Sequence, residues 1–206
     1  MHVLLINGSP HEKGCTYTAL NLVAGELNAA GITTEILNVG TKPVGGCIGC
    51  GGCAKGNGCV FGGVVNEAIE KARTADAFVF GTPVHYASAS GNMTSFLDRL
   101  AYAGGKYLAY KPAAICASAR RAGTTSALDQ LVKYPEFFHM PLVSGSYWPM
   151  VHGSNPEQVL QDEEGCAVMK ELGRNMAWLL QCIEAGKAAG ISHPENPRRP
   201  MTNFIR

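Results

Sequence analysis

The sequence predicts an α/β protein with a doubly wound, five-stranded parallel sheet in the order 2-1-3-4-5 and helices on both faces. Strand-like apolar runs alternate with helical patterns five times along the 206 residues. The chain also begins with a buried-type strand, His2–Asn7, that leads through a polar, glycine-containing turn into a helix. Five strands with this opening unit favour the order 2-1-3-4-5 over a six-stranded nucleotide-binding sheet.

Each expected strand is a short apolar run, and each expected helix has apolar residues on one face at helical spacing. Strands are expected at 2–7, 33–39, 77–80 and 113–117 and from 141 onward, and helical patterns cover 15–27, 65–72, 93–100, 124–132 and 162–185. In the predicted strand order the chain reverses direction between strands 1 and 3, and ligands bind at such a switch point, at the carboxyl ends of the strands. We expect a single domain over residues 1–206, with a Cys-rich loop at 45–63 and an extended tail at about 187–206.

The composition and net charge of the chain exclude several classes of function. Hydrophobic residues make up 46% and charged residues 16% of the chain, and 25 residues are glycine, which is typical of a compact, loop-rich protein rather than a disordered one. The net charge of +1 gives no electrostatic basis for binding nucleic acid. The apolar runs are too short for a membrane span or a signal peptide, so we expect a cytoplasmic protein with no membrane partner. In that compartment, the eight cysteines indicate reduced thiols or metal ligands.

The turn after the first strand has the features of a phosphate-binding site. Gly8-Ser9-Pro10 ends the strand, and a helix starts at Cys15-Thr16. Backbone N–H groups, hydroxyls and the helix dipole together favour an anion. The segment matches neither G-x-G-x-x-G nor the Walker A motif, and its hydroxyls favour a phosphomonoester bound without a metal. The alternative is an ordinary turn in which Ser9 caps the helix.

A second long βα loop, Thr82–Gly91, is rich in small residues and contains His85 and Tyr86. Its backbone is suited to approach a flat ligand closely, and a flavin ring fits such a loop because it needs backbone partners along its edge. The alternative is a plain surface loop with Tyr86 packed inward.

These motifs resemble the NADPH-dependent FMN reductase family, whose fold is flavodoxin-like. The resemblance covers roughly residues 1–135, and its motifs are Asn7-Gly8-Ser9-Pro10, Gly14-Cys15-Thr16, Gly81-Thr82-Pro83-Val84, Gly91-Asn92-Met93 and Phe96-Leu97-Asp98-Arg99. It implies a single FMN-binding domain in which the phosphate is held by the first loop and the isoalloxazine by the second, with Ser118–Gly123 at its far edge. The implied FMN-binding residues are Ser9, Pro10, His11, Cys15, Thr16, Pro83, Val84, His85, Tyr86, Ser118, Arg120, Arg121 and Gly123. His85 and Thr94 depart from the Tyr and Lys often found there.

Arg120 and Arg121 lie in the third of these loops. A guanidinium there would stabilise negative charge on a reduced flavin, or would bind the phosphate of NAD(P)H. The alternative is a pair of solvated loop arginines.

Four cysteines, Cys47, Cys50, Cys53 and Cys59, fall within thirteen glycine-rich residues. Cys-x2-Cys-x2-Cys is a compact ligand run for an iron–sulfur cluster, whereas zinc sites more often use two separate pairs. The spacing resembles that of the iron–sulfur flavoproteins, a branch of the same family. This implies a [4Fe-4S] cluster that passes electrons to FMN, usually in a homodimer or homotetramer. Zinc, or thiols without a metal, remain the alternatives.

The sequence therefore predicts an FMN-dependent NAD(P)H oxidoreductase that reduces a small acceptor such as a quinone, a flavin, a nitro or azo compound, or oxygen. No catalytic side chain is required, because the flavin carries the chemistry. The alternative is an iron–sulfur flavoprotein electron carrier that is fed by a ferredoxin-type donor.

The remaining cysteines, Cys116, Cys166 and Cys182, are expected to pack as small hydrophobic residues. Tyr147 and Trp148 are expected to cap the flavin or to form an oligomer contact, and 203–206 to dock on a neighbour.

Overall fold

Strand β1 (His2–Asn7) lies in the middle of a parallel sheet in the computed structural model, which describes residues 1–196 and 201–202. It pairs with β2 (Thr33–Asn38) on one side and β3 (Ala77–His85) on the other. Beyond β3 follow β5 (Ala113–Ala119) and β6 (Met150–His152). Within the described residues, the parallel strands therefore have the order β2-β1-β3-β5-β6, which confirms the predicted 2-1-3-4-5.

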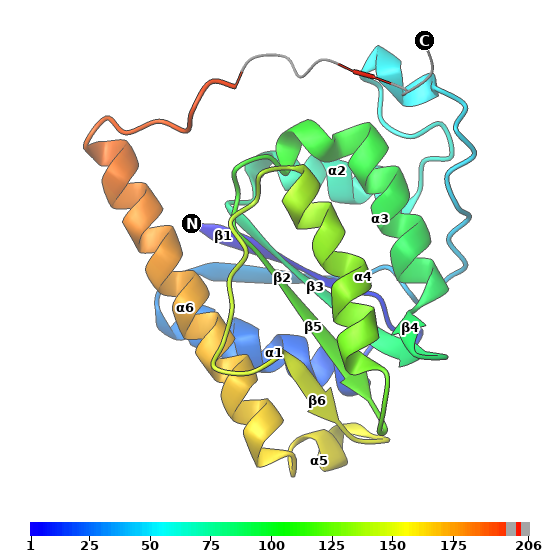
Figure 1. Ribbon diagram of the computed structural model, residues 1–206, viewed down its shortest axis with the longest axis vertical. Coiled ribbons are helices and arrows are strands. Elements are labelled where there is room, and N and C mark those ends of the chain that lie inside the picture. The colour runs from blue at the N-terminus through cyan, green and yellow to red at the C-terminus, as the bar shows by residue number, and fades with distance from the viewer. Residues whose placement is uncertain (197–200, 203–206) are drawn as a thin grey trace.

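The long helices cover both faces of the sheet (Figure 1). One face packs on α1 (Cys15–Ala29) and α6 (Glu163–Ala188), and the other on α2 (Val64–Thr74), α3 (Gly91–Gly104) and α4 (Thr124–Phe137). Alternate side chains of each strand fill the two apolar cores, as expected for strands buried on both faces. The short elements are η1 (Gly52–Lys55), β4 (Ser88–Ala89), η2 (Gly105–Tyr107) and α5 (Pro156–Val159).

The third strand is longer than predicted, and the expected loop at 82–91 is largely a β-hairpin. The backbone of β3 stays paired with β5 as far as Pro83, and the chain reverses at Tyr86 and Ala87 into β4. Both reversing residues have positive φ, 49° and 59°, as a two-residue hairpin turn requires. Asn-Gly is the usual sequence for such a turn, so the Tyr86-Ala87 pair did not predict the hairpin from sequence.

The fifth parallel strand lies at Met150–His152 instead of starting at Pro141. Leu142 makes only an isolated bridge with Ala113. Side chains of α6 hold the next residues outside the sheet: Glu171 accepts hydrogen bonds from the Ser146 N–H and hydroxyl at 2.8 and 2.6 Å. The predicted position of this strand was therefore wrong. The residues that would have continued the strand after Leu142 are instead hydrogen-bonded to side chains of α6.

The C-terminal part differs little from expectation. Helix α6 continues to Ala188, and residues 191–196 have no regular secondary structure. His193 stacks on Tyr110 with ring centroids 4.4 Å apart. The expected docking of 203–206 lies outside the described residues. No helix in the described part of the chain is both long enough and apolar enough to cross a membrane.

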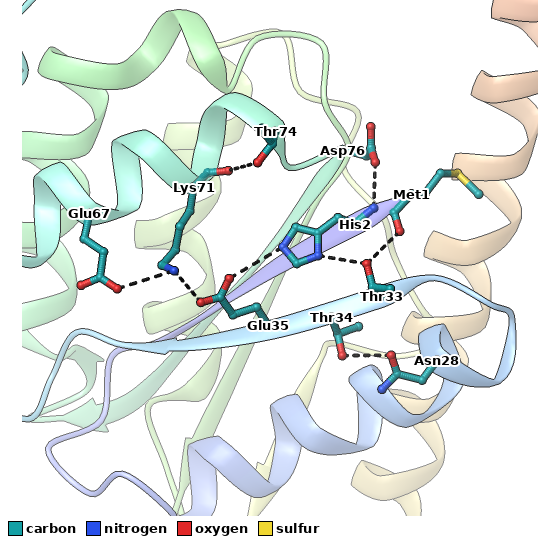
Figure 2. A network of polar contacts seen from close by, with 10 residues as sticks. All are labelled: Met1, His2, Asn28, Thr33, Thr34, Glu35, Glu67, Lys71, Thr74 and Asp76. Atoms are coloured by element: carbon teal, nitrogen blue, oxygen red, sulfur yellow. Dashed lines mark hydrogen bonds and ion pairs between the residues drawn. The ribbon is translucent and has the colours of Figure 1, made fainter.

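A polar network fastens the edge strand β2 at the amino end of β1 (Figure 2). Glu35 of β2 pairs with Lys71 of α2 at 2.7 Å, and this hydrogen-bonded carboxylate raises the pKa of Lys71. The His2 ring contacts Thr33 at 3.1 Å, and the His2 N–H donates to Asp76 at 2.7 Å. These contacts fix the register of the edge strand at the end of the sheet opposite to the predicted ligand loops.

The three cysteines outside the Cys-rich loop differ in exposure. Cys116 of β5 is fully buried, as predicted, and burial raises the pKa of its thiol to about 12. The half-buried Cys166 thiol donates to the carbonyl of Val159 at 3.2 Å. Cys182 is exposed, so its expected packing was wrong.

Iodoacetamide is expected to leave Cys116 unmodified in the folded protein at neutral pH, because its thiol is both inaccessible and protonated. The exposed Cys182 should react. Peptide mass mapping with and without urea measures both, and Cys116 should become labelled only in urea. Equal labelling of the two thiols in the native state would contradict the structure.

Candidate functional site

The loop that follows β1 is shaped by Asn7, a fully buried polar side chain at the strand's carboxyl end. Its amide donates to the carbonyls of His11 and Glu12 at 3.4 and 3.2 Å, and its Oδ1 accepts the Ser9 N–H at 3.1 Å. Ser9 is also buried, and its hydroxyl accepts the His11 N–H at 3.1 Å. The loop is therefore held in a fixed curve by side-chain contacts of its own residues.

Helix α1 begins at this loop without a side-chain cap, because Gly14 occupies the N-cap position. Within the described residues, the N–H groups of Thr16 and Tyr17 have no hydrogen-bond acceptor, and the Cys15 N–H contacts its own side-chain sulfur. The buried hydroxyls of Thr16 and Ser118 lie beside this helix end, 2.7 Å apart. Free N–H groups, hydroxyls and the positive end of a helix dipole together suit a phosphate group.

The half-buried thiol of Cys15 lies 3.5 Å from the carbonyl of Gly153, just after β6. Burial raises the pKa of Cys15, so the thiol is neutral at pH 7 and adds no repulsion toward an anion at the helix end. The loops after β1, β5 and β6 therefore meet at one end of the sheet.

Sequence reasoning missed Ser90, which joins the first loop to the hairpin. Its hydroxyl donates to the carbonyl of Gly8 at 2.8 Å and caps α3 by accepting the Met93 N–H at 3.3 Å. The Thr82 hydroxyl oxygen accepts the Ser90 N–H at 3.0 Å. The available signal was its position three residues before Met93, the first periodic apolar residue of the predicted helix, since capping serines are common at helix starts.

The hairpin projects beside this loop, and Gln130 of α4 fixes its base. The Oε1 atom of Gln130 accepts hydrogen bonds from the Ser88 hydroxyl and the Ala89 N–H, at 2.7 and 3.0 Å. Tyr86 at the tip is fully exposed, so the alternative in which it packs inward is wrong. His85 is exposed as well, whereas Pro83 and Val84 are half-buried.

The other predicted FMN-binding residues lie at the rim of this region. Pro10 and His11 are exposed on the first loop, and Arg120 and Arg121 are exposed just beyond β5. Gly123, with φ of 93°, packs directly beneath the hairpin tip. The structure thus brings the three predicted loops together at the carboxyl ends of β1, β3 and β5, with the hydroxyls buried and the arginines at the surface.

Replacing Gly123 by alanine is expected to displace the hairpin and weaken flavin binding. A Cβ at this position would lie 2.6 Å from the Cα of Ala87, and the backbone is in the left-handed region. The matched control is Gly31→Ala, which has φ of 75° but no atom within 4 Å of the added Cβ. The control should lose only about 1 kcal/mol of stability. FMN titration measures the affinity of each variant for FMN, and urea unfolding measures its stability. Equal FMN affinity in the two variants would contradict the predicted clash.

The four clustered cysteines line a second pocket, of about 230 Å³, on the outer side of α3. Arg99, Tyr102 and Ala103 of α3 form its helical wall. Cys47 and Cys50 are exposed, and Cys53 and Cys59 are half-buried. Among the described residues, no three His, Cys, Asp or Glu side chains are placed to hold a metal ion. The thiols therefore share one pocket without converging on a point.

Two side chains hold the ends of this loop. Asn66 of α2 accepts the Cys59 N–H at 2.8 Å and donates to the Cys59 carbonyl at 3.1 Å. Asn92 of α3 donates to the carbonyls of Gly40 and Lys42, at 2.9 and 3.1 Å. Helix α3 thus touches the first loop through Ser90, the start of the Cys-rich segment through Asn92 and the thiol pocket through Arg99.

Tyr147 and Trp148 were predicted to cap the flavin or to form an oligomer contact. Both are exposed and lie apart from the predicted FMN-binding residues, so the capping role is not supported and the oligomer contact stays a prediction. They line a pocket of about 450 Å³ together with Leu128 and Val132 of α4. None of the predicted FMN-binding residues lines that pocket.

The fold, the phosphate-type loop and the hairpin define a flavin-binding α/β domain. Residues 1–155 match the family described as NADPH-dependent FMN reductase, and the chain belongs to that family. It is similar to an iron–sulfur flavoprotein of Archaeoglobus fulgidus, at 30% identity over 83% of this chain and 86% of that protein. It is also similar to one of Methanocaldococcus jannaschii, at 28% identity over 89% of this chain and all of that protein. A solved NAD(P)H:quinone oxidoreductase from Methanothermobacter marburgensis shares the fold, with a TM-score of 0.66, 17% identity, and coverage of 85% of this chain and 96% of that one.

Proposed function

We propose that this protein oxidises NAD(P)H with bound FMN and passes the electrons to a small acceptor such as a quinone, a flavin, a nitro or azo compound, or oxygen. The observation that supports it is the meeting of three loops around the uncapped start of α1, where buried hydroxyls lie beside free N–H groups. This donor set is uncharged, which fits the phosphate monoester of FMN bound without a metal. Bound FMN supplies the transfer of hydride and electrons.

The chain's own residues have binding and positioning roles in this proposal. Ser9, Thr16 and Ser118 would hold the phosphate together with the N–H groups of the first turn of α1. The hairpin from Pro83 to Tyr86 would lie along the isoalloxazine, and its rigid attachment to Gln130 would keep it in place. No acid or base is required from the protein, since the cofactor carries the chemistry.

The exposed Arg120 and Arg121 are placed to meet an incoming charged substrate. We assign them to the phosphates of NAD(P)H or to the edge of the flavin. Guanidinium groups bind phosphate through two parallel hydrogen bonds, which suits the first of these roles. Their exposure means that each contributes little to stability, so their replacement would test binding without disturbing the fold.

We further propose that Cys47, Cys50, Cys53 and Cys59 hold a [4Fe-4S] cluster. All four line one pocket, and thiolates are the ligands that such clusters use. Binding would draw the thiols closer together than they lie in the structure. Between Cys47 and Cys59, four glycines already have positive φ, and three of them have no atom within 4 Å of where a Cβ would lie, so the backbone has room to adjust. The positive-φ glycines within the cysteine segment are Gly49, Gly51, Gly56 and Gly58.

A second candidate function is an electron carrier that accepts electrons from a ferredoxin-type donor. The observation in its favour is the apolar surface around the thiol pocket, where Ile48, Val60 and Phe61 are exposed. A partner protein bound there would lie beside the proposed cluster. In this version NAD(P)H would not reduce the flavin.

The test is to purify the protein without oxygen and to measure flavin, iron, acid-labile sulfide and zinc per chain. One FMN with about four irons and four sulfides is expected, as four thiolates hold one such cluster. NADH, NADPH and reduced ferredoxin are then offered in turn, and flavin reduction is followed by absorbance. Reduction by NADH or NADPH supports the reductase, whereas reduction by ferredoxin alone supports the carrier. Protein that binds no FMN would overturn both.

A further inference from the structure

Arg99 is a buried cation in the wall of the thiol pocket. It lies on α3 and is only 6% exposed. Its Nε–H donates to the Cys59 sulfur at 3.2 Å. Nη1 donates to the carbonyl of Gly45 at 3.3 Å and Nη2 to that of Gly62 at 3.1 Å. The guanidinium therefore contacts the loop both before its first cysteine and after its last.

The charge of this guanidinium is not balanced by a carboxylate in the part of the chain that the structure describes. Within residues 1–196 and 201–202, no carboxylate forms an ion pair with Arg99, and two of its three hydrogen-bond acceptors are neutral carbonyls. The ring of Phe61 covers it, 5.4 Å from the guanidinium carbon. Burying an unpaired cation is costly, so the pocket is electrostatically incomplete without a negative group. The only side chains that line this pocket and can become negative are the four thiols and Tyr102.

The shape of the guanidinium suits the loop, and so does its charge. A planar fork fixes several N–H directions at once, which a lysine ammonium cannot do. Here one nitrogen faces sulfur and two face carbonyls on opposite arms of the loop. Arg99 therefore determines both the width of the loop and the direction from which Cys59 receives a hydrogen bond.

We propose that Arg99 is the positioning residue of the cysteine pocket, which clamps both arms of the loop and stabilises negative charge on the Cys59 sulfur and on the cluster bound there. This inference rests on the proposed [4Fe-4S] site and assigns a residue outside the four ligands to it. Hydrogen bonds to cluster sulfurs and nearby charge both set the reduction potential. Arg99 should make the potential less negative, because the reduced cluster carries one more negative charge than the oxidised one.

The test compares anaerobically purified wild type with Arg99→Lys and Arg99→Met. The lysine variant keeps a cation, and the methionine variant keeps an apolar stem of similar length. Arg174→Met is the matched control, since Arg174 is an exposed arginine of α6 that pairs with Glu26 at 3.2 Å, outside this pocket. Iron, sulfide and FMN per chain are measured, and an EPR-monitored redox titration gives the cluster potential. Circular dichroism and FMN binding check that each variant folds.

Arg99→Met is expected to lose more than half of the iron, and the cluster that remains should titrate at a more negative potential. Arg99→Lys should keep more iron and shift the potential less, and Arg174→Met should match the wild type. Wild-type iron content and potential in folded Arg99→Met would overturn the inference and leave the proposed function intact. A wild type that binds FMN but no iron, even after incubation with ferrous iron and sulfide, would overturn the cluster and this inference together. Loss of iron in Arg99→Met from a wild type that NAD(P)H does not reduce would support the inference and overturn the reductase.

Discussion

FMN binding is expected to weaken about ten- to a hundred-fold when Thr16 is replaced by valine, because a hydrogen bond to a charged group contributes roughly 1.5–3 kcal/mol. Thr16 is 1% exposed, and its hydroxyl lies at the uncapped start of α1, 2.7 Å from that of Ser118. Valine keeps the shape and removes the hydroxyl. Titration of the apoprotein with FMN, followed by quenching of flavin fluorescence, gives the dissociation constant.

Riboflavin provides the internal control for this prediction, because it lacks the phosphate. Its affinity should be nearly the same in wild type and Thr16→Val. Thr74→Val is the matched protein control. Thr74 is an exposed threonine at the end of α2, near Asp76 and the amino end of β1, and therefore at the end of the sheet opposite to the site (Figure 2). Its hydroxyl donates to the Lys71 carbonyl at 3.3 Å. An unchanged FMN affinity in Thr16→Val would place the phosphate elsewhere.

Cys50→Ser is expected to remove most of the iron, from about four per chain to less than one, because serine oxygen is a poor substitute for a soft thiolate ligand. Cys50 is exposed, and no hydrogen bond joins its side chain to any described residue. Its replacement should therefore leave the free energy of unfolding nearly unchanged. Iron and sulfide analysis of anaerobically purified protein measures the loss.

Cys182→Ser is the matched control, since Cys182 is an exposed thiol on α6 that does not line the pocket. It should keep the full iron content. FMN content should be equal in both variants, because the hydroxyls of the phosphate loop are untouched. If Cys50→Ser retains wild-type iron, the proposed ligand set is wrong.

The sequence by itself determined the layered fold, because periodicity and strand–helix alternation report burial directly. It also predicted the first loop, whose residues Ser9 and Thr16 lie only seven positions apart in the chain and are both buried. Its prediction that the four cysteines share a site needed only the short glycine-rich loop that joins them, and the structure places all four at one pocket. Each of these features depends on residues near one another in sequence, or on a pattern that repeats along it.

Only the tertiary structure decided the contacts between distant segments. Ser90 joins the hairpin to Gly8, and Gln130 of α4 holds the base of that hairpin. Arg99 forms hydrogen bonds with a loop some forty to fifty residues earlier in the chain. The same holds for the displaced fifth strand, where Glu171 captures the backbone of Ser146. A side chain that forms a hydrogen bond with the backbone of a remote segment produces no periodic pattern in the sequence around it. For that reason, the residues that position the site became visible only when the chain was folded.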